Sequence, residues 1–361
     1  MPSTLNLQAR EAETDCAHVD FEQWSTRWGP VTPWTRDPRD PARRTMFYLG
    51  TSNPFWLNIS PVPLFINASR FARYRSHGDQ WPARMQVPWA GDSGAYTALQ
   101  PGADRATNPW WRDPDEFGGM WTRFIECTGP PDFVGIQDFP CEPVCLRTTG
   151  GSVREHQEAT LESYLYLTEQ FPHVPWLATL QGWRPRDYLD HHAMYEDAGV
   201  EMAGRRVGIG SICRKGSQYD VAAILESLAP LGMLMHGFGT SANALALSGD
   251  RLYTADSHAW AVTARKERLL LPACTHRPRR TRDGRREPPD CRNCFRFALH
   301  YREKIATALR RCATRSRTAD TDLWGQRVHT RRRPPRRPGP RAAAVTRPRT
   351  QGTGQIALFG G

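Results

Sequence analysis

The stretch VPWAGDSGAYTAL, from Val87 to Leu99, turns from an apolar run into Gly-Asp-Ser-Gly and then into a segment that can begin a helix. This order is typical of a β-strand followed by a tight turn and a helix. Asp92 lies where the strand ends. Because an aspartate in front of a helix often accepts hydrogen bonds from its free amides, Asp92 is either a capping residue or a reactive carboxylate.

The chain contains eight short apolar segments rich in β-branched or aromatic residues, and stretches of helical periodicity follow several of them. Strands that alternate with helices pair in parallel, and eight repeats over about 220 residues predict an α/β fold, a closed (β/α)8 TIM-like barrel. An open doubly wound sheet is the alternative, but no glycine-rich dinucleotide fingerprint follows the first strand. The expected strands are 46–51, 62–68, 87–93, 133–138, 175–182, 206–211, 232–239 and 251–257, and the expected helices are 153–171, 186–199, 218–232 and 258–270.

The composition indicates a globular protein with an anionic partner. The chain has 361 residues, of which 39% are hydrophobic, and a formal net charge of +11. No apolar run approaches the roughly 20 residues that cross a bilayer, and the N-terminal sequence lacks the layout of a signal peptide. We therefore expect a cytoplasmic protein with no membrane association. Nine cysteines, an odd number, favour reduced thiols and a metal site over a disulfide framework.

The two ends of the sequence differ from its centre. Residues 1–45 are rich in polar groups, proline and tryptophan, and we interpret them as an N-terminal extension before a barrel over 46–312. From 310 to 349 the sequence has 13 arginines and two acidic residues, a composition that cannot bury enough apolar surface to fold. We expect a disordered, basic, Arg/Pro-rich tail over 313–361 and an exposed loop over the arginine-rich stretch 277–289.

Barrel enzymes hold their reactive groups at the C-terminal ends of the strands. Here those ends carry three aspartates, Asp92, Asp138 and Asp256, which would face one bowl. Asp256 is also placed to cap the helix that follows it. Paired carboxylates are the usual means of cleaving a glycosidic bond, because one attacks the anomeric carbon while the other handles the proton of the leaving group. The neighbouring strands end at Gln181, at Gly208 with Gly210, and at His236.

Six short motifs follow one another along the chain and precede a cluster of cysteines and a histidine. They are GDSGAY, IQDFPCEP, TLQGW, VGIGS, HGFGTS and TADSHAWA. In this order they resemble the tRNA-guanine transglycosylase superfamily over residues 46–309, and more closely its DNA-acting branch, the deazapurine DNA modification protein A (DpdA) group. The resemblance implies a glycosyltransferase that replaces guanine in DNA by a 7-deazaguanine such as preQ0, through a covalent intermediate between an aspartate and the sugar.

The resemblance gives two of the aspartates catalytic roles. Asp256 matches the nucleophile that attacks C1′ of the sugar, and Asp92 of the DSG motif matches the general acid/base near the departing base. A purine leaves poorly as an anion, so a proton donor at the base and a carboxylate at the opposite face of the sugar each lower the barrier. The family motif usually reads DSGG, whereas Ala95 replaces its last glycine here, which concerns the shape of the loop more than the role of Asp92.

Four further positions match groups that bind the substrate. Asp138 and Gln181 match the residues that recognise the guanine edge. Ser93 belongs to the same DSG motif as Asp92, and Gly208 matches the backbone donor to the carbonyl oxygen of the base.

Two other functions stay open. A tRNA-guanine transglycosylase that acts on tRNA shares the motif set, although the altered metal pattern and the segments SNPFWL and IQDFPCEP favour DNA. A catalytically inactive barrel that only binds nucleic acid is the third interpretation. The presence of both Asp92 and Asp256 argues against it.

The segments CTH and CRNC predict a metal site formed by Cys274, His276, Cys291 and Cys294. A full set of thiolate and imidazole ligands leaves no open position, so the ion would be a structural zinc. Unrelated buried thiols are the alternative, but cysteines in this polar, arginine-rich context have little core to join. The tRNA-acting enzymes show three closely spaced cysteines and a distant histidine. Here His276 takes the middle position, and His300 competes with it as the fourth ligand.

The final segment, GTGQIALFGG (352–361), carries apolar side chains after a polar tail. Exposed apolar groups are stabilised only when a partner covers them. The segment resembles the Gln-Leu-x-Leu-Phe peptide by which bacterial proteins bind the replication sliding clamp, with Gln355, Leu358 and Phe359 at matching positions and Ile356 in place of leucine. A flexible tether would then raise the local concentration of DNA around the barrel.

We expect a peptide spanning 350–361 to bind the sliding clamp with micromolar affinity, since a groove on the clamp would cover its apolar residues. Replacing Leu358 and Phe359 by alanine should abolish the binding measured by calorimetry and leave base exchange on short DNA unchanged. If the unmutated peptide gives no binding heat, the tail is an electrostatic arm with salt-sensitive affinity for nucleic acid.

Overall fold

The computed structural model describes residues 37–318, apart from 72–73, 77, 80, 83–86, 273 and 282. Most of the expected N-terminal extension and of the expected tail therefore lies outside the described residues. The same holds for the candidate clamp-binding residues Gln355, Leu358 and Phe359. Within the described part, no helix is both long and apolar enough to cross a membrane.

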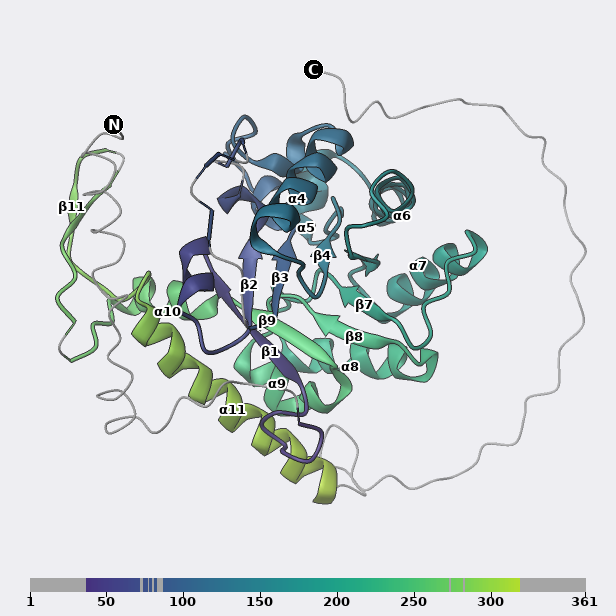
Figure 1. Cartoon of the computed structure of the whole chain (residues 1–361). Helices are drawn as coiled ribbons and strands as arrows, with labels where there is room; N and C mark the ends of the chain where they lie inside the picture. Colours follow the sequence, from purple (N-terminus) through teal and green to yellow (C-terminus); the bar gives the residue numbers. More distant parts are fainter. Residues whose placement is uncertain are drawn as a thin grey trace, which may run out of the picture. The chain divides into compact units, whose positions relative to one another are not determined.

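Nine parallel strands form one sheet that curls into a nearly closed barrel (Figure 1). Their order along the sheet is β5, β4, β3, β2, β1, β9, β8, β7 and β6. The two edge strands are halves of the single expected strand 175–182, and only Ala178 separates them. The predicted eight-stranded barrel is therefore confirmed, with its fifth strand broken at one residue. The strands are β1 Met46–Thr51, β2 Leu64–Asn67, β3 Trp89–Asp92, β4 Val134–Gly135, β5 Trp176–Leu177, β6 Thr179–Leu180, β7 Arg206–Ile209, β8 Leu234–Gly237 and β9 Thr254–Ser257.

Helices lie between successive strands, and all four expected helices are present. Helix α6 begins with a capping box, in which the Ser152 hydroxyl accepts from the Glu155 amide and the Glu155 carboxylate accepts from the Ser152 amide. The last helix continues to Thr318, so the start of the expected tail at 313 falls inside a helix. The α-helices are α3 Ala95–Ala98, α4 Pro114–Thr128, α5 Pro143–Thr149, α6 Val153–Gln170, α7 Pro185–Asp197, α8 Gln218–Leu228, α9 Ala242–Ser248, α10 Ala259–Glu267 and α11 Phe295–Thr318. The 3-10 turns are Pro54–Asn58, Ala68–Arg70, Pro109–Trp111, Ala229–Leu231 and Gly249–Arg251.

Aromatic rings fill the interior of the barrel around His236. The centroid of the His236 ring lies 4.8 Å from that of Phe133 and 4.7 Å from that of Phe238, and Phe65 and Tyr48 complete the cluster. Such tilted and edge-on contacts are the favoured geometry for aromatic pairs. The cluster packs the barrel as a solid core and leaves the strand ends to carry the polar groups.

The arginine-rich stretch 277–289 differs from the loop that the sequence predicts. It contains two short antiparallel strands, β10 Arg279–Arg280 and β11 Arg286–Glu287, which form a ribbon beside the start of α11 (Figure 1). A turn joins them, with the amide of Thr281 donating to the carbonyl oxygen of Arg285 and with Gly284 at φ 80°. A glycine tolerates this left-handed conformation, which explains why the stretch closes into a hairpin.

Two adjacent glycines of α4 test the packing of this helix with opposite signs. Gly118 is buried, and a Cβ at this position would lie 2.3 Å from the ring of Phe171, whereas a Cβ at Gly119 has no neighbour within 4 Å. Gly118→Ala should lower the free energy of unfolding by about 1–3 kcal/mol because it overpacks the core. Gly119→Ala should raise it by up to about 1 kcal/mol because alanine favours the helix. Chemical denaturation measures both, and shifts of the same sign would contradict this packing.

Candidate active site and metal centre

Asp92 ends β3, and two donors hold its carboxyl group. Nδ2 of Asn67, at the end of β2, donates to Oδ2 at 2.5 Å, and the amide of Gly94 also donates to the carboxylate. Burial and then the charge of Asp256 raise the pKa of Asp92 to about 6. Asp92 therefore braces the turn and can also exchange a proton near neutral pH. The N-cap of the short helix α3 is Gly94, so Asp92 is not a simple helix cap.

Asp256 is buried on β9. Its Oδ1 accepts a hydrogen bond from the amide of Gly239 at 2.9 Å and lies 3.4 Å from Nε2 of His236. Burial raises the pKa of Asp256 to about 7, against the opposing effect of the Gly239 hydrogen bond. The N-cap of α10 is His258, which excludes the alternative that Asp256 only caps this helix.

His236 joins the aromatic core to Asp256. Its Nδ1 lies 2.9 Å from the hydroxyl oxygen of Thr254, and burial lowers its pKa well below the usual range, so the ring is neutral. When the Thr254 hydroxyl donates to Nδ1, the ring proton lies on Nε2 and faces Asp256. In that tautomer His236 favours the ionised form of the carboxyl group.

Three of the predicted substrate-binding side chains meet at Asp138. The hydroxyl of Ser93 donates to Oδ1 at 2.7 Å, and Nε2 of Gln181 donates to Oδ2 at 2.5 Å. Burial raises the pKa of Asp138 to about 7, and the hydrogen bond from Ser93 opposes this shift.

The three aspartates interact, as their positions at the strand ends predict. The charge of Asp256 raises the pKa of Asp92, and the charge of Asp92 raises the pKa of Asp138. They therefore titrate as a coupled set around neutral pH.

Two buried residues that sequence reasoning left without a role extend this network. Oγ of Ser211 lies 2.7 Å from Oε1 of Gln181 and 2.8 Å from Oε2 of Glu142, and it accepts from the amide of Cys141 at 2.7 Å. Ser211 has φ 55°, a left-handed conformation that costs a non-glycine residue about 1–2 kcal/mol. Its hydrogen bonds hold it there. Their only trace in the sequence is that Glu142 and Ser211 stand inside the motifs IQDFPCEP and VGIGS.

The structure corrects the role expected of Gly208. Its amide donates to the carbonyl oxygen of Ala178 at 2.8 Å as part of the barrel, and a residue has only one backbone N–H to give. A Cβ at Gly208 would lie 2.5 Å from the ring of Phe238, so close packing accounts for this glycine. The amide of Gly210 is likewise used, by the carbonyl oxygen of Leu180 at 2.9 Å. Gly208 therefore does not supply the backbone donor to a bound base.

The four predicted metal ligands come together at the start of α11. The ligand atoms of Cys274, His276, Cys291 and Cys294 all lie within 4.8 Å of one another. Sγ of Cys274 lies 3.8 Å from Sγ of Cys294, and Nε2 of His276 lies 3.5 Å from Sγ of Cys291. His300, the competing ligand, lies on the exposed side of α11 outside this cluster.

These distances fit a tetrahedral metal ion. With Zn–S bonds of about 2.3 Å and a Zn–N bond of about 2.1 Å, a tetrahedron separates two sulfurs by about 3.8 Å and a sulfur from a nitrogen by about 3.6 Å. The amide of Leu271 donates to Sγ of Cys291 at 3.3 Å, as expected for a thiolate ligand. The cluster can therefore hold a metal without rearrangement.

A (β/α)8 barrel with aspartates at its strand ends and a cysteine-histidine cluster beyond the last strand defines a transglycosylase of the tRNA-guanine transglycosylase superfamily. The family DpdA, DeoxyPurine in DNA protein A, matches residues 43–331, and the chain belongs to this family. No curated protein matches the chain. Membership makes the protein a transglycosylase-type enzyme with a role in DNA modification and a nucleic-acid substrate.

The raised pKa of Asp256 predicts that the active site costs stability at neutral and alkaline pH. Folding favours the protonated form, so stability is full below the unfolded pKa of 3.8 and is lost as the pH rises through about 7. Asp256→Asn cannot ionise and should be more stable than the wild type by on the order of 2 kcal/mol at pH 8, with little difference at pH 4. Denaturant unfolding at both pH values measures this. A difference that does not change with pH would contradict the burial of an ionisable Asp256.

Metal binding by the cluster predicts a stability that depends on its ligands. Cys291→Ser should release the metal and lower the thermal midpoint, because the four ligands are assembled only in the folded chain. His276→Ala should do the same, whereas His300→Ala should keep one metal ion per chain in elemental analysis. Retention of the ion without His276 and its loss without His300 would contradict the ligand set.

Proposed function

We propose that this protein replaces guanine in DNA by a 7-deazaguanine, such as preQ0, through a covalent bond between Asp256 and the sugar. The observation that carries the proposal is the coupled set of three buried carboxyl groups, with pKa values raised to about 6–7, at the strand ends of a DpdA-family barrel. Carboxyl groups in this range can change their proton during a reaction at neutral pH. The target nucleotide must leave the base stack to reach them.

In the first step, the ionised carboxylate of Asp256 attacks C1′ of the deoxyribose. The bond between C1′ and N9 breaks, its electron pair goes to the purine, and protonated Asp92 gives the base a proton, so that guanine leaves uncharged. The Gly239 amide and His236 favour the anion at Asp256, while burial favours the proton at Asp92. An ester between Asp256 and C1′ remains.

In the second step, the 7-deazaguanine takes the place of guanine. Asp92, now a carboxylate, takes the proton from N9, N9 attacks C1′, and Asp256 leaves as a carboxylate. Guanine and the deazapurine share the edge that carries N1–H, the amino group and the carbonyl oxygen. Asp138 would accept from this edge and Gln181 would donate to it, so the same side chains would hold both bases.

The remaining assignments follow from the same residues. A backbone donor to the base would come from the turn at Ser211, since the amides of Gly208 and Gly210 are used inside the barrel. The metal would be a structural zinc held by Cys274, His276, Cys291 and Cys294, because this full set of ligands leaves no position for substrate. Binding of the replication clamp through Gln355, Leu358 and Phe359 would direct the enzyme to DNA.

Asp256→Asn tests the covalent mechanism. The amide keeps the volume and can still accept from Gly239, but it cannot attack C1′, so incorporation of labelled base into DNA should fall to background while DNA affinity is unchanged. Asp92→Asn should also be severely impaired, and Glu126→Gln, on the outside of α4, serves as a control. Normal incorporation by Asp256→Asn would rule out this nucleophile. Incorporation into tRNA but not into DNA would instead support the tRNA alternative.

A further inference from the structure

The hydroxyl group of Ser211 has more acceptor neighbours than it has hydrogens. It already accepts from the Cys141 amide, and it lies 2.7 Å from Oε1 of Gln181 and 2.8 Å from Oε2 of Glu142. A serine has one hydroxyl hydrogen, so it can donate to only one of these two oxygens. The other oxygen must bring a hydrogen of its own.

Gln181 does not bring that hydrogen in the orientation found, because its Nε2 donates to Oδ2 of Asp138 at 2.5 Å. Turning the amide over would direct its oxygen at Asp138, which requires a proton on Asp138. The network therefore holds one proton, either on Glu142 or on Asp138, and the orientation of the Gln181 amide depends on which of them carries it.

We propose that Glu142 is protonated in the active enzyme and acts as a positioning residue for base recognition. It donates to Ser211, Ser211 donates to Gln181, and Gln181 donates to an ionised Asp138. This proposal rests on the proposed function, in which ionised Asp138 accepts hydrogen bonds from the base. The proton on Glu142 leaves Asp138 free to stay ionised and fixes the donor side of Gln181.

The surroundings of Glu142 favour its protonated form. Its side chain is 2% exposed, and burial raises its pKa. Sγ of Cys213 lies 3.6 Å from Oε1, and Lys215 is the one cation among the groups acting on it. Lys215 is the weakest of these influences and is itself held over the ring of Trp183 at 3.5 Å. The other titratable groups that face Glu142 are Tyr96, Asp138, Cys141, Cys145 and Tyr188.

This arrangement predicts a loss of base binding at alkaline pH. When Glu142 also ionises, Ser211 faces two acceptors with one hydrogen, so Gln181 loses its fixed orientation. The KM for the free base should then rise with pH while kcat at saturating base changes less. Glu142→Gln keeps a donor at the same place and cannot ionise, so its KM at neutral pH should stay within about threefold of the wild type and should lose this alkaline rise. Glu142→Leu removes the donor and should raise KM about tenfold or more.

Two controls keep the test sharp. Cys213→Ala changes a neighbour of Glu142 outside the chain of donors and should leave the pH profile unchanged. Infrared difference spectra between wild type and Glu142→Gln at neutral pH should show the carboxylic acid band of a protonated Glu142, whether or not exchange is observed. Absence of that band, or an alkaline limb that persists in Glu142→Gln, would overturn the proposal. Absence of exchange in the wild type with the band present would count against the proposed function alone.

A second and independent observation concerns the ribbon formed by β10 and β11. Five exposed arginines lie along it, and its register places Arg280 directly opposite Arg286. Like charges that face each other across two strands destabilise the pair. The exposed arginines are Arg277, Arg279, Arg280, Arg285 and Arg286.

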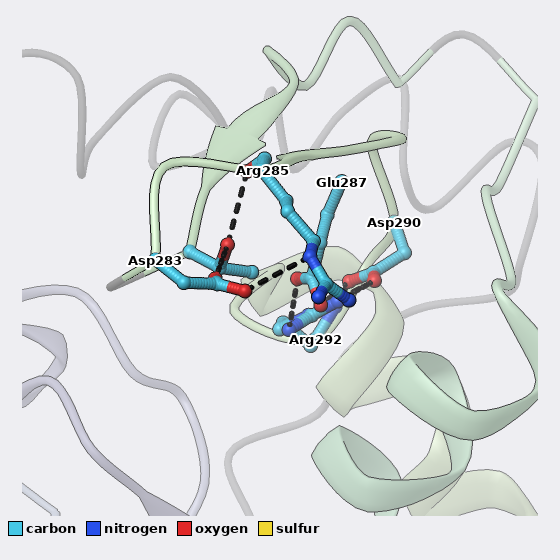
Figure 2. A network of polar contacts seen from close by, with 6 residues as sticks. Asp283, Arg285, Glu287, Asp290 and Arg292 are labelled. Carbon is cyan, nitrogen blue, oxygen red and sulfur yellow. Dashed lines mark hydrogen bonds and ion pairs between the residues drawn. The ribbon is translucent and has the colours of Figure 1, made fainter.

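The base of the ribbon is held against this repulsion (Figure 2). Arg292 forms ion pairs with Glu287 at 2.9 Å and with Asp290 at 2.6 Å, and Arg285 pairs with Asp283 at 3.0 Å. The metal ligands also flank the ribbon on both sides in the sequence. The nearby acidic groups are thus taken up by Arg285 and Arg292, and the Arg280 and Arg286 pair stays electropositive.

We infer that the ribbon contacts the phosphate backbone of the nucleic-acid substrate. Regularly spaced phosphates would relieve the repulsion between Arg280 and Arg286, and guanidinium groups bind phosphate oxygens in pairs. The partner is a nucleic acid and not an acidic protein, because the repeated charge matches a row of arginines without any apolar contact on the ribbon.

The test uses the full chain with Arg280→Gln and Arg286→Gln together. Two lost phosphate contacts should make the slope of log affinity against log salt shallower by about two, and affinity near 0.1 M salt should fall about tenfold. The control removes the same charge on α6 and α7 through Arg154→Gln and Arg186→Gln, which should change the slope much less. Metal content should equal that of the wild type in both. A slope equal to that of the control would overturn the inference.

Discussion

The structure depends on placing ionisable groups on top of a barrel whose interior is packed with aromatic rings. The cluster around His236 fills the space beneath the strand ends, so Asp92, Asp138 and Asp256 lose hydration from below and ionise less readily than in water. This loss of hydration is unfavourable for stability and favourable for proton exchange. The same apolar interior that stabilises the fold therefore sets the acidity of the site.

Hydrogen bonds then give the three carboxyl groups different environments. Asp256 receives a backbone amide and faces a neutral imidazole, Asp92 receives an amide group from Asn67, and Asp138 ends a chain of donors that begins at Glu142. Similar pKa values thus come with different partners, which is how one bowl can hold a nucleophile, an acid and a base-binding group. The metal cluster and the ribbon lie outside this bowl, at the start of α11, where the chain can contact a long substrate without disturbing the reacting groups.

Sequence periodicity predicted the barrel well, because buried parallel strands need short apolar segments and the helices between them need a different period. It placed the three aspartates together for the same reason, since parallel strands present their C-terminal ends at one rim. The break at Ala178 and the hairpin within 277–289 were missed, because both depend on hydrogen bonds to distant or turn-forming residues.

The side-chain networks could not be predicted from the sequence. Ser211 and Glu142 are far apart along the chain and meet only after the barrel closes. Gly208 was given a role by its motif, but the amide that a motif places near a ligand can already be used by the next strand, as it is here by Ala178. Spacing alone left His276 and His300 open, and only the assembled cluster distinguishes them.

The central claim is that this barrel exchanges guanine for a deazapurine in DNA. Mass spectrometry of nucleosides from the DNA and the tRNA of cells with and without the protein tests it most directly. The account predicts a 7-deazaguanine deoxynucleoside in DNA that appears only when the protein is present, with unchanged tRNA nucleosides. A deazaguanine that depends on the protein in tRNA alone, or no modified deoxynucleoside in either sample, would contradict it.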